Sequence, residues 1–189
     1  MKVLIIPEDQ SVDRHVIVPV VQRVFADLGR RAQIEVLPEP RLRGASHALS
    51  ADLVREIVES RRMFDLFLLV VDRDCNREQH EEKAAARVAE HPDKLIACLA
   101  WQEVEVWLLA LYRDELDDPW PIVRAECDPK ERYCEPLLQR KGWSRLLGRG
   151  YAQAMGSLAG NWRGLVSVCP EIDELKQRIA AHLEAGTPA

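Results

Sequence analysis

The chain has 189 residues and a formal net charge of −5, from 26 Lys and Arg against 31 Asp and Glu. With 47% hydrophobic and 30% charged residues, it has the composition of an ordinary globular domain, not of a disordered or fibrous chain. Its apolar runs are far shorter than the ~20 residues of a membrane span, and the N-terminus turns acidic where a signal peptide would continue apolar. The acidic balance argues against whole-surface binding of nucleic acid but leaves a local basic face possible.

Short apolar runs alternate with amphipathic segments over the first 113 residues. Runs of consecutive apolar residues predict buried strands, and apolar residues at three- and four-residue spacing predict helices. The expected strands are 2–7, 34–37, 67–71 and 95–100, and the expected helices are 16–28, 49–58, 78–90 and 103–111. Residues 41–48 are expected to form a loop. This alternation predicts an α/β fold with a mostly parallel sheet and helices on both faces.

The pattern changes after residue 113, where four prolines punctuate the chain and strand signals vanish. A last helix is expected after Pro170, with apolar positions from Ile172 to Leu183. We therefore predict an α/β core at 1–113 and a loop-rich, helical C-terminal extension at 114–189 that packs on the core as part of a single domain.

Cysteines and histidines give little sign of a site. The five cysteines include no C-x-x-C pair, so we expect reduced thiols, as in a cytoplasmic protein, and no structural zinc. His80 and His91 fall in a polar helix and at its end, where solvated side chains are expected.

Acidic residues follow two of the expected strands. The strand at 2–7 runs into Glu8, and the strand at 67–71 runs into Asp72-Arg73-Asp74. Ligands of open parallel sheets gather at the carboxyl ends of the strands, and carboxylate oxygens suit Mg²⁺ or Mn²⁺. Such carboxylates also cap turns, so a structural role for the D-x-D remains an alternative.

A third acidic element opens the helix after the last strand, at Glu103 and Glu105. Acidic residues in a first helical turn complement the helix dipole, which accounts for at least one of the two. Trp107 and the leucines that follow it are expected in the core.

With these residues, the sequence resembles the TOPRIM family, which includes topoisomerases, primases and OLD (overcoming lysogenization defect) nucleases. The matching segments are LIIPEDQSVDR, LLVVDRDCN, the block Glu105–Ala110 (EVWLLA), and weaker signals at Asp128-Pro129-Lys130 and Cys169-Pro170. Together they span most of the chain. Asp9 stands where that family commonly has a glycine.

The resemblance implies a TOPRIM-like, Rossmann-like fold and Mg²⁺-dependent phosphodiester hydrolysis of DNA or RNA, in a defence locus against phage with an ATPase partner. It implies that Glu8 acts as general acid/base or metal ligand, and that Asp72 and Asp74 bind Mg²⁺ or Mn²⁺. Glu105, with Asp13 or Glu103, would help to hold a second ion. A catalytically inactive TOPRIM-like module that binds nucleic acid or an ATPase is the alternative.

Other D-x-D chemistries fit less well. In HAD-type phosphatases the motif lies on the first strand, and nucleotide-sugar enzymes that use D-x-D are normally longer. The chain has no G-x-x-x-x-G-K-[ST] motif, so an ATPase activity would have to come from a partner.

The segment 136–170 has five cations and no Asp or Glu, with two tryptophans and a tyrosine between them. Basic groups beside aromatic side chains suit phosphate contact and base stacking, although the same residues could be the core and solvated outside of the extension. The candidate nucleic-acid-binding residues are Arg140, Lys141, Arg145, Arg149 and Arg163.

Overall fold

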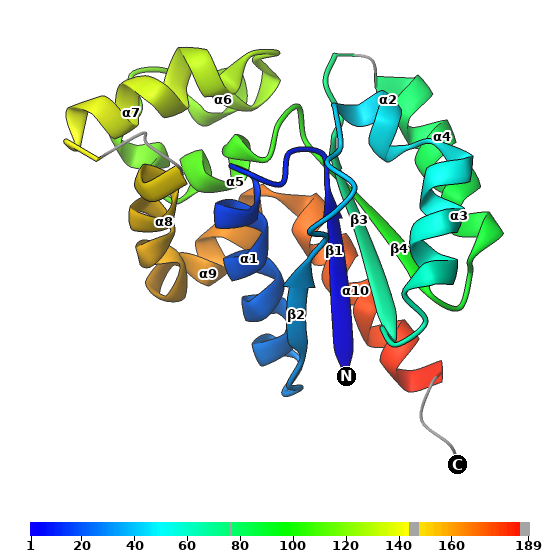
Figure 1. Cartoon of the computed structure of the whole chain (residues 1–189). Coiled ribbons are helices and arrows are strands. Elements are labelled where there is room, and N and C mark those ends of the chain that lie inside the picture. Colours follow the sequence, from blue (N-terminus) through cyan, green and yellow to red (C-terminus); the bar gives the residue numbers. More distant parts are fainter. Residues whose placement is uncertain (76, 144–147, 186–189) are drawn as a thin grey trace.

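A computed structural model describes residues 1–75, 77–143 and 148–185. Its centre is a four-stranded, entirely parallel sheet with the strand order β2-β1-β3-β4 (Figure 1). The strands are β1 (Lys2–Pro7), β2 (Gln33–Val36), β3 (Leu66–Asp72) and β4 (Leu95–Ala100). The predicted parallel α/β sheet is therefore confirmed, and the arrangement is consistent with a Rossmann-like fold.

Helices occupy most of the rest of the described chain. They are α1 (Arg14–Asp27), α2 (Ala45–Ala48), α3 (Ala51–Ser60), α4 (Arg77–Glu90), α5 (Glu105–Ala110), α6 (Trp120–Ala125), α7 (Glu135–Arg140), α8 (Arg149–Ala154), α9 (Leu158–Val168) and α10 (Pro170–Ala185). Short 3₁₀ turns lie at Arg113–Glu115 (η1) and Met155–Ser157 (η4), and Lys130–Cys134 (η2) is a π-helical segment.

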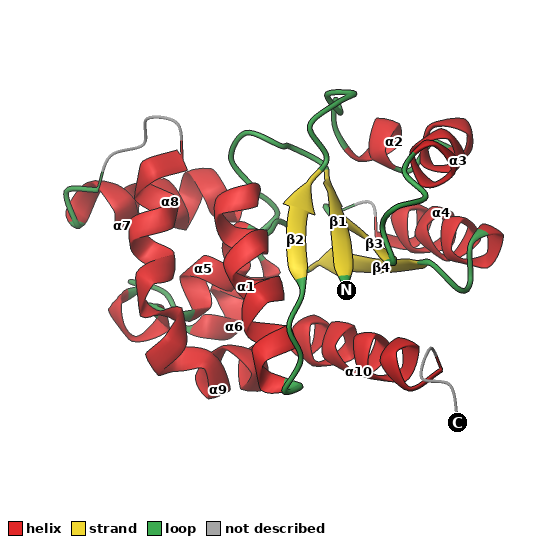
Figure 2. Cartoon of the chain, turned by 60° about the horizontal axis from the view of Figure 1, so that its bottom comes forward, coloured by secondary structure: helices red, strands yellow, loops and turns green. Residues whose placement is uncertain are grey.

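Both faces of the sheet are covered, as the apolar runs of its strands predict. Alternate residues of β1, such as Ile5 and Ile6, belong to two separate core clusters. One cluster includes α1, α5, α9 and α10, and the other includes α3 and the buried Ala84 of α4. Figure 2 shows these two groups of helices on opposite sides of the sheet. The C-terminal helices thus share one core with the sheet.

One local expectation is wrong, and another is incomplete. The expected loop at 41–48 contains the short helix α2, in which the N–H of Ala48 bonds to the carbonyl of Gly44 at 3.1 Å. The stretch after residue 113 is more helical than its prolines indicate, because Pro121 and Pro136 lie in the first turns of α6 and α7, where no helical hydrogen bond is lost.

The cysteines also depart from expectation. Cys75 and Cys127 form a disulfide with their Cα atoms 5.8 Å apart, whereas Cys98, Cys134 and Cys169 are free and buried. The pair is 52 positions apart, so no local spacing could reveal it. Among the described residues, no helix is long and apolar enough to cross a membrane.

Candidate functional site

A polar cleft of about 750 Å³ lies where the strands β1 and β3 end. The chain leaves β1 through α1 on one face of the sheet and leaves β3 through α4 on the other, which is the switch point where parallel sheets bind ligands. All six acidic residues predicted for the site line this cleft. They are Glu8, Asp13, Asp72, Asp74, Glu103 and Glu105.

Glu8 is held at the junction of two strands. Its Oε2 accepts a hydrogen bond from the main-chain N–H of Asp72 at 3.2 Å. Gly44 lies alongside with a positive φ of 84°, and a Cβ added there would lie 3.7 Å from Glu8 Oε1. The loop before α2 therefore forms one wall beside the Glu8 carboxylate.

Asp72 and Asp74 are positioned by the adjoining end of β4. Asp72 Oδ1 accepts a hydrogen bond from Val104 N at 2.9 Å, and Asp74 N donates to the carbonyl of Gln102 at 3.0 Å. Asp74 and Gln102 have left-handed backbones, with φ of 49° and 62°, which Asp tolerates better than most residues. The two strands thus turn sharply together, and both D-x-D carboxylates reach the cleft.

Asp13 comes from the turn that opens α1. It is 6% exposed, and its Oδ2 accepts a hydrogen bond from Asp9 N at 2.9 Å. Asp9 in turn accepts from Ser11 N at 2.7 Å. Among the described residues, the only non-glycine positions with positive φ are Asp74 and Gln102, so the turn at Asp9 does not require the conformational freedom of glycine.

A lysine accompanies the remaining two carboxylates. The main-chain N–H of Lys130 donates to Glu103 Oε2 at 2.9 Å, and its Nζ lies 3.8 Å from Glu105 Oε1. Glu105 is 2% exposed and also accepts a hydrogen bond from the hydroxyl of Tyr151 at 2.9 Å. The weak Asp128-Pro129-Lys130 signal therefore supplies a cation to the cleft.

The carboxylates raise one another's pKa. Burial is the largest cause in each case, and it raises the pKa of Asp13 and of Glu103 to about 7. Burial, followed by the charges of Asp13 and Glu105, raises the pKa of Asp72 well above its usual range. Burial also raises the pKa of Glu8 and of Glu105, although hydrogen bonds and Lys130 oppose it. Acids with raised pKa values in one cleft are typical of a functional site.

The donor set fits a hard divalent cation by its chemistry, because seven carboxylates, the six predicted ones and Asp9, share one cleft and repel one another. The geometry is less complete. Within the part of the chain that the structure describes, no three His, Cys, Asp or Glu side chains are grouped closely enough to hold a metal ion. The oxygens of Glu8, Asp72 and Glu103 are instead engaged by main-chain N–H groups, so ion binding would require side-chain adjustment.

The basic residues of the cleft are not those that the sequence indicated. Arg14, Arg41, Arg43 and Lys130 line it. Arg41 and Arg43 follow β2, whose carboxyl end lies at the same edge of the sheet. A pair of arginines shortly after a predicted strand is the sequence feature that could have indicated them.

The predicted basic residues of the extension lie elsewhere. Arg140 donates to Asp117 at 2.8 Å, and Lys141 lies 2.6 Å from Glu115, so the fold supplies acidic partners that the local sequence lacks. Arg149 in α8 and Arg163 in α9 are exposed and do not line the cleft. Arg145 lies outside the described residues.

His80 supports the site from α4 and was wrongly expected to be solvated. It is 6% exposed, and its Nδ1–H donates to the main-chain carbonyl of Asp72 at 3.2 Å. The helix packs this histidine under the end of β3, so His80 positions the strand end that carries the D-x-D. Its burial comes from tertiary packing, which the polar sequence of α4 does not reveal.

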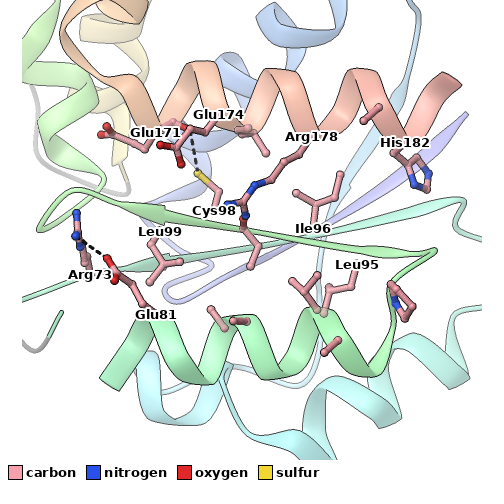
Figure 3. Close-up of a pocket in the computed structure, with 18 of the residues that line it drawn as sticks. Arg73, Glu81, Leu95, Ile96, Cys98, Leu99, Glu171, Glu174, Arg178 and His182 are labelled. Atoms are coloured by element: carbon pink, nitrogen blue, oxygen red, sulfur yellow. Dashed lines mark hydrogen bonds and ion pairs between the residues drawn. The ribbon is translucent and has the colours of Figure 1, made fainter. Parts of the chain in front are cut away.

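A second cavity, of about 1210 Å³, runs along the outer edge of β4 between α4 and α10 (Figure 3). Arg178 of α10 reaches into it and donates to the main-chain carbonyl of Ala97 at 3.0 Å. This contact covers a carbonyl that an added strand would need, so it protects the edge of the sheet. None of the six acidic residues lines this cavity.

The chain was compared with known proteins: no family model, no curated protein and no solved structure matches it. The inference of function therefore depends on the cleft alone.

Proposed function

We propose that this chain is a TOPRIM-like, Mg²⁺- or Mn²⁺-dependent hydrolase of nucleic-acid phosphodiester bonds. One observation carries the proposal: carboxylates from the ends of β1 and β3, from the start of α1 and from the start of α5 line one cleft at the switch point of a parallel sheet. Metal-dependent hydrolysis of a phosphodiester uses a divalent cation, a proton acceptor and basic groups that offset the substrate's charge, and residues suited to each role line this cleft.

Asp72 and Asp74 would hold the ion together with Glu8, and Glu105 with Asp13 or Glu103 would hold a second one. A bound divalent cation would polarise a phosphoryl oxygen and lower the pKa of water at the site. The D-x-D is suited to this task because main-chain bonds to the end of β4 fix the backbone of Asp74 and the Oδ1 of Asp72.

Glu8 is the best candidate for moving a proton. Burial raises its pKa above the ordinary value of a glutamate, although the main-chain bond from Asp72 opposes the shift, and a raised pKa makes the carboxylate a better proton acceptor. One oxygen is held by the N–H of Asp72, which orients the carboxyl group in the cleft. Exposed Arg41 and Arg43, in the loop before α2 that forms the wall beside Glu8, are suited to bind phosphate oxygens in a bidentate manner.

The test is cleavage by the purified protein of supercoiled DNA, single-stranded DNA and structured RNA with Mg²⁺ or Mn²⁺. We expect Asp72→Asn and Glu8→Gln each to lower the rate at least about 100-fold, as loss of a reacting group does. Asp52→Asn is the matched control, because this carboxylate is 93% exposed on α3. Absence of cleavage by the folded protein, or equal cleavage by Asp72→Asn, would refute the proposal.

A second candidate is a catalytically inactive module that binds nucleic acid or an ATPase partner. The contacts of Lys130 favour it, because an ammonium group beside Glu105 already offsets part of the charge that an ion would balance. Calorimetric titration with Mn²⁺ separates the two proposals. A site lost in Asp74→Asn supports the hydrolase, whereas nucleic-acid or ATPase binding without any Mn²⁺ binding supports the module.

A further inference from the structure

The disulfide between Cys75 and Cys127 joins two chain segments that contribute residues to the acidic cleft. Cys75 directly follows Asp74, and Cys127 is three positions before Lys130. The bond therefore connects the loop that carries the D-x-D to the segment that carries the lysine of the cleft. The three other cysteines are free and buried.

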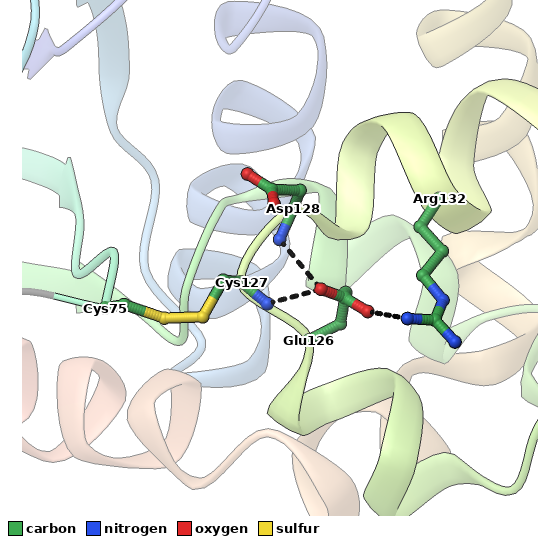
Figure 4. The surroundings of a disulfide bond; sticks show 5 residues. All are labelled: Cys75, Glu126, Cys127, Asp128 and Arg132. Atoms are coloured by element: carbon green, nitrogen blue, oxygen red, sulfur yellow. Dashed lines mark hydrogen bonds and ion pairs between the residues drawn. A yellow bond between two sulfur atoms is a disulfide. The ribbon is translucent and has the colours of Figure 1, made fainter.

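Hydrogen bonds from Glu126 connect the residues around Cys127, so a displacement of the cysteine would affect the neighbouring residues (Figure 4). Glu126 Oε1 accepts hydrogen bonds from Cys127 N at 2.9 Å and from Asp128 N at 3.4 Å. Glu126 Oε2 accepts from Arg132 at 2.6 Å, beyond Lys130. Hydrogen bonds therefore close the turn on both sides of Lys130, so we expect a displacement of Cys127 to reach the lysine.

Both bonded cysteines are exposed, so small thiols and redox proteins can reach the sulfurs. A disulfide that only stabilises a fold is commonly buried, and this one lies at the surface beside a charged cleft. From its position, exposure and connection to Lys130, we propose that Cys75 and Cys127 form a thiol–disulfide switch that sets how firmly Lys130 is held in the cleft.

The chemical step is exchange with a dithiol reductant. A thiolate of the reductant attacks one sulfur and displaces the other as a thiolate, and the second reductant thiol then resolves the mixed disulfide. Two electrons and two protons pass to the protein, which ends with two cysteine thiols, while the reductant ends as its own disulfide. In the reverse reaction, glutathione disulfide takes two electrons and two protons from the cysteine thiols, which re-form their disulfide while two glutathione thiols are released.

Reduction leaves Lys130 with its contacts to Glu103 and Glu105 but removes the covalent bond between its segment and the loop after β3. We expect faster opening of the 126–132 segment in the reduced protein. A less constrained ammonium group competes less well with a divalent cation, so cations should bind more tightly. This second consequence rests on the proposed metal-dependent function, whereas the first does not.

The first measurement counts reactive thiols in the folded protein with iodoacetamide and mass spectrometry. We expect no alkylation after equilibration with glutathione disulfide and modification of Cys75 and Cys127 after dithiothreitol. Alkylation of both residues after the oxidising treatment would overturn the proposal.

The second measurement is amide hydrogen exchange at Lys130, whose N–H donates to Glu103. We expect dithiothreitol to speed this exchange at least about tenfold in the native protein. In the variants Cys75→Ser and Cys127→Ser, the Lys130 amide should exchange at the fast rate with or without dithiothreitol. Equal exchange in the oxidised and reduced protein would overturn the switch and leave a static cross-link.

Mn²⁺ titration of both forms separates this inference from the proposed function. Tighter binding in the reduced form supports the switch and the metal site together. Accelerated exchange without Mn²⁺ binding in either form supports the switch and refutes the metal-dependent function.

Discussion

The main-chain N–H of Asp72 donates a hydrogen bond to the Glu8 carboxylate across 64 positions of sequence, with an N–O distance of 3.2 Å. Parallel pairing of β1 with β3 brings these residues together, because Pro7 lies opposite Val70 in the register. The Glu8 carboxylate at the end of β1 is thus oriented by the main chain of Asp72 at the end of the neighbouring strand β3. Four experiments test what this arrangement implies.

Asp72→Asn should stabilise the metal-free protein and weaken cation binding. Asn keeps an oxygen for the 2.9 Å bond from Val104 N and removes a charge that burial and neighbouring carboxylates disfavour. We expect the free energy of unfolding at pH 8 to rise by about 1 kcal/mol, and the Mn²⁺ affinity to fall at least about tenfold. Urea unfolding and calorimetry measure the two effects. A less stable variant with unchanged Mn²⁺ affinity would contradict this prediction.

Stability without cations should fall as the pH rises from 5.5 to about 8. The pKa values of Asp13 and Glu103 are raised to about 7, so between their ordinary and raised values the folded protein binds more protons than the unfolded chain. Their stabilising contribution is complete below their ordinary pKa values and is lost as the pH rises through about 7. One pKa unit corresponds to about 1.4 kcal/mol, so we expect a loss of at least about 1 kcal/mol.

Urea unfolding in chelator measures this slope. Starting at pH 5.5 keeps Asp9, Asp27 and Glu126, whose pKa values are lowered, in their ionised form throughout. The double variant Asp13→Asn, Glu103→Gln should reduce the slope, and Asp72, Glu8 and Glu105, whose pKa values are also raised, account for the remainder. A slope that the double variant leaves unchanged would show that other groups cause it.

Lys130→Met should destabilise the protein more at high pH than at low pH. The substitution keeps much of the aliphatic chain but removes the ammonium group 3.8 Å from Glu105, which is 2% exposed. Leaving a buried carboxylate without its partner should cost about 1–3 kcal/mol at pH 8 and less at pH 5, where the carboxyl group can take up a proton. Lys94→Met, at an exposed position, is the control. Equal losses for both variants would argue against the pair.

The two sets of cations make different predictions for nucleic-acid binding. If the cleft binds the backbone, Arg41→Gln with Arg43→Gln should weaken binding and reduce the slope of log affinity against log salt by about 1–2. Arg140→Gln with Lys141→Gln should change it less, because Asp117 and Glu115 already pair with those side chains. Anisotropy of labelled DNA and RNA at several salt concentrations gives both slopes, and the opposite ranking would favour the extension as the binding surface.

Much of the fold could be predicted from the sequence. Strands β1 and β4 occur at the expected residues, and β2 and β3 within one residue of them, because buried strands of a parallel sheet are uninterrupted apolar runs. Glu8, Asp72 and Asp74 could also be placed together, because strand ends at one edge of a sheet are close by topology alone. These inferences depend on local patterns and on rules that hold for any parallel sheet. Asp13, Glu103 and Glu105 entered the set through the resemblance to a family, and the fold places them in the same cleft.

The tertiary structure decided which other residues lie beside the acidic residues of the cleft. Lys130, Arg41 and Arg43 reach the cleft, and His80 is buried beneath it, through packing that no local spacing encodes. The same packing joins Cys75 to Cys127 and pairs Arg140 with Asp117, which offsets a basic charge that the segment shows when considered alone. The sequence by itself determines the order of apolar and charged groups along the chain. Only the fold brings distant groups close enough for burial, charge and covalent bonding to act between them.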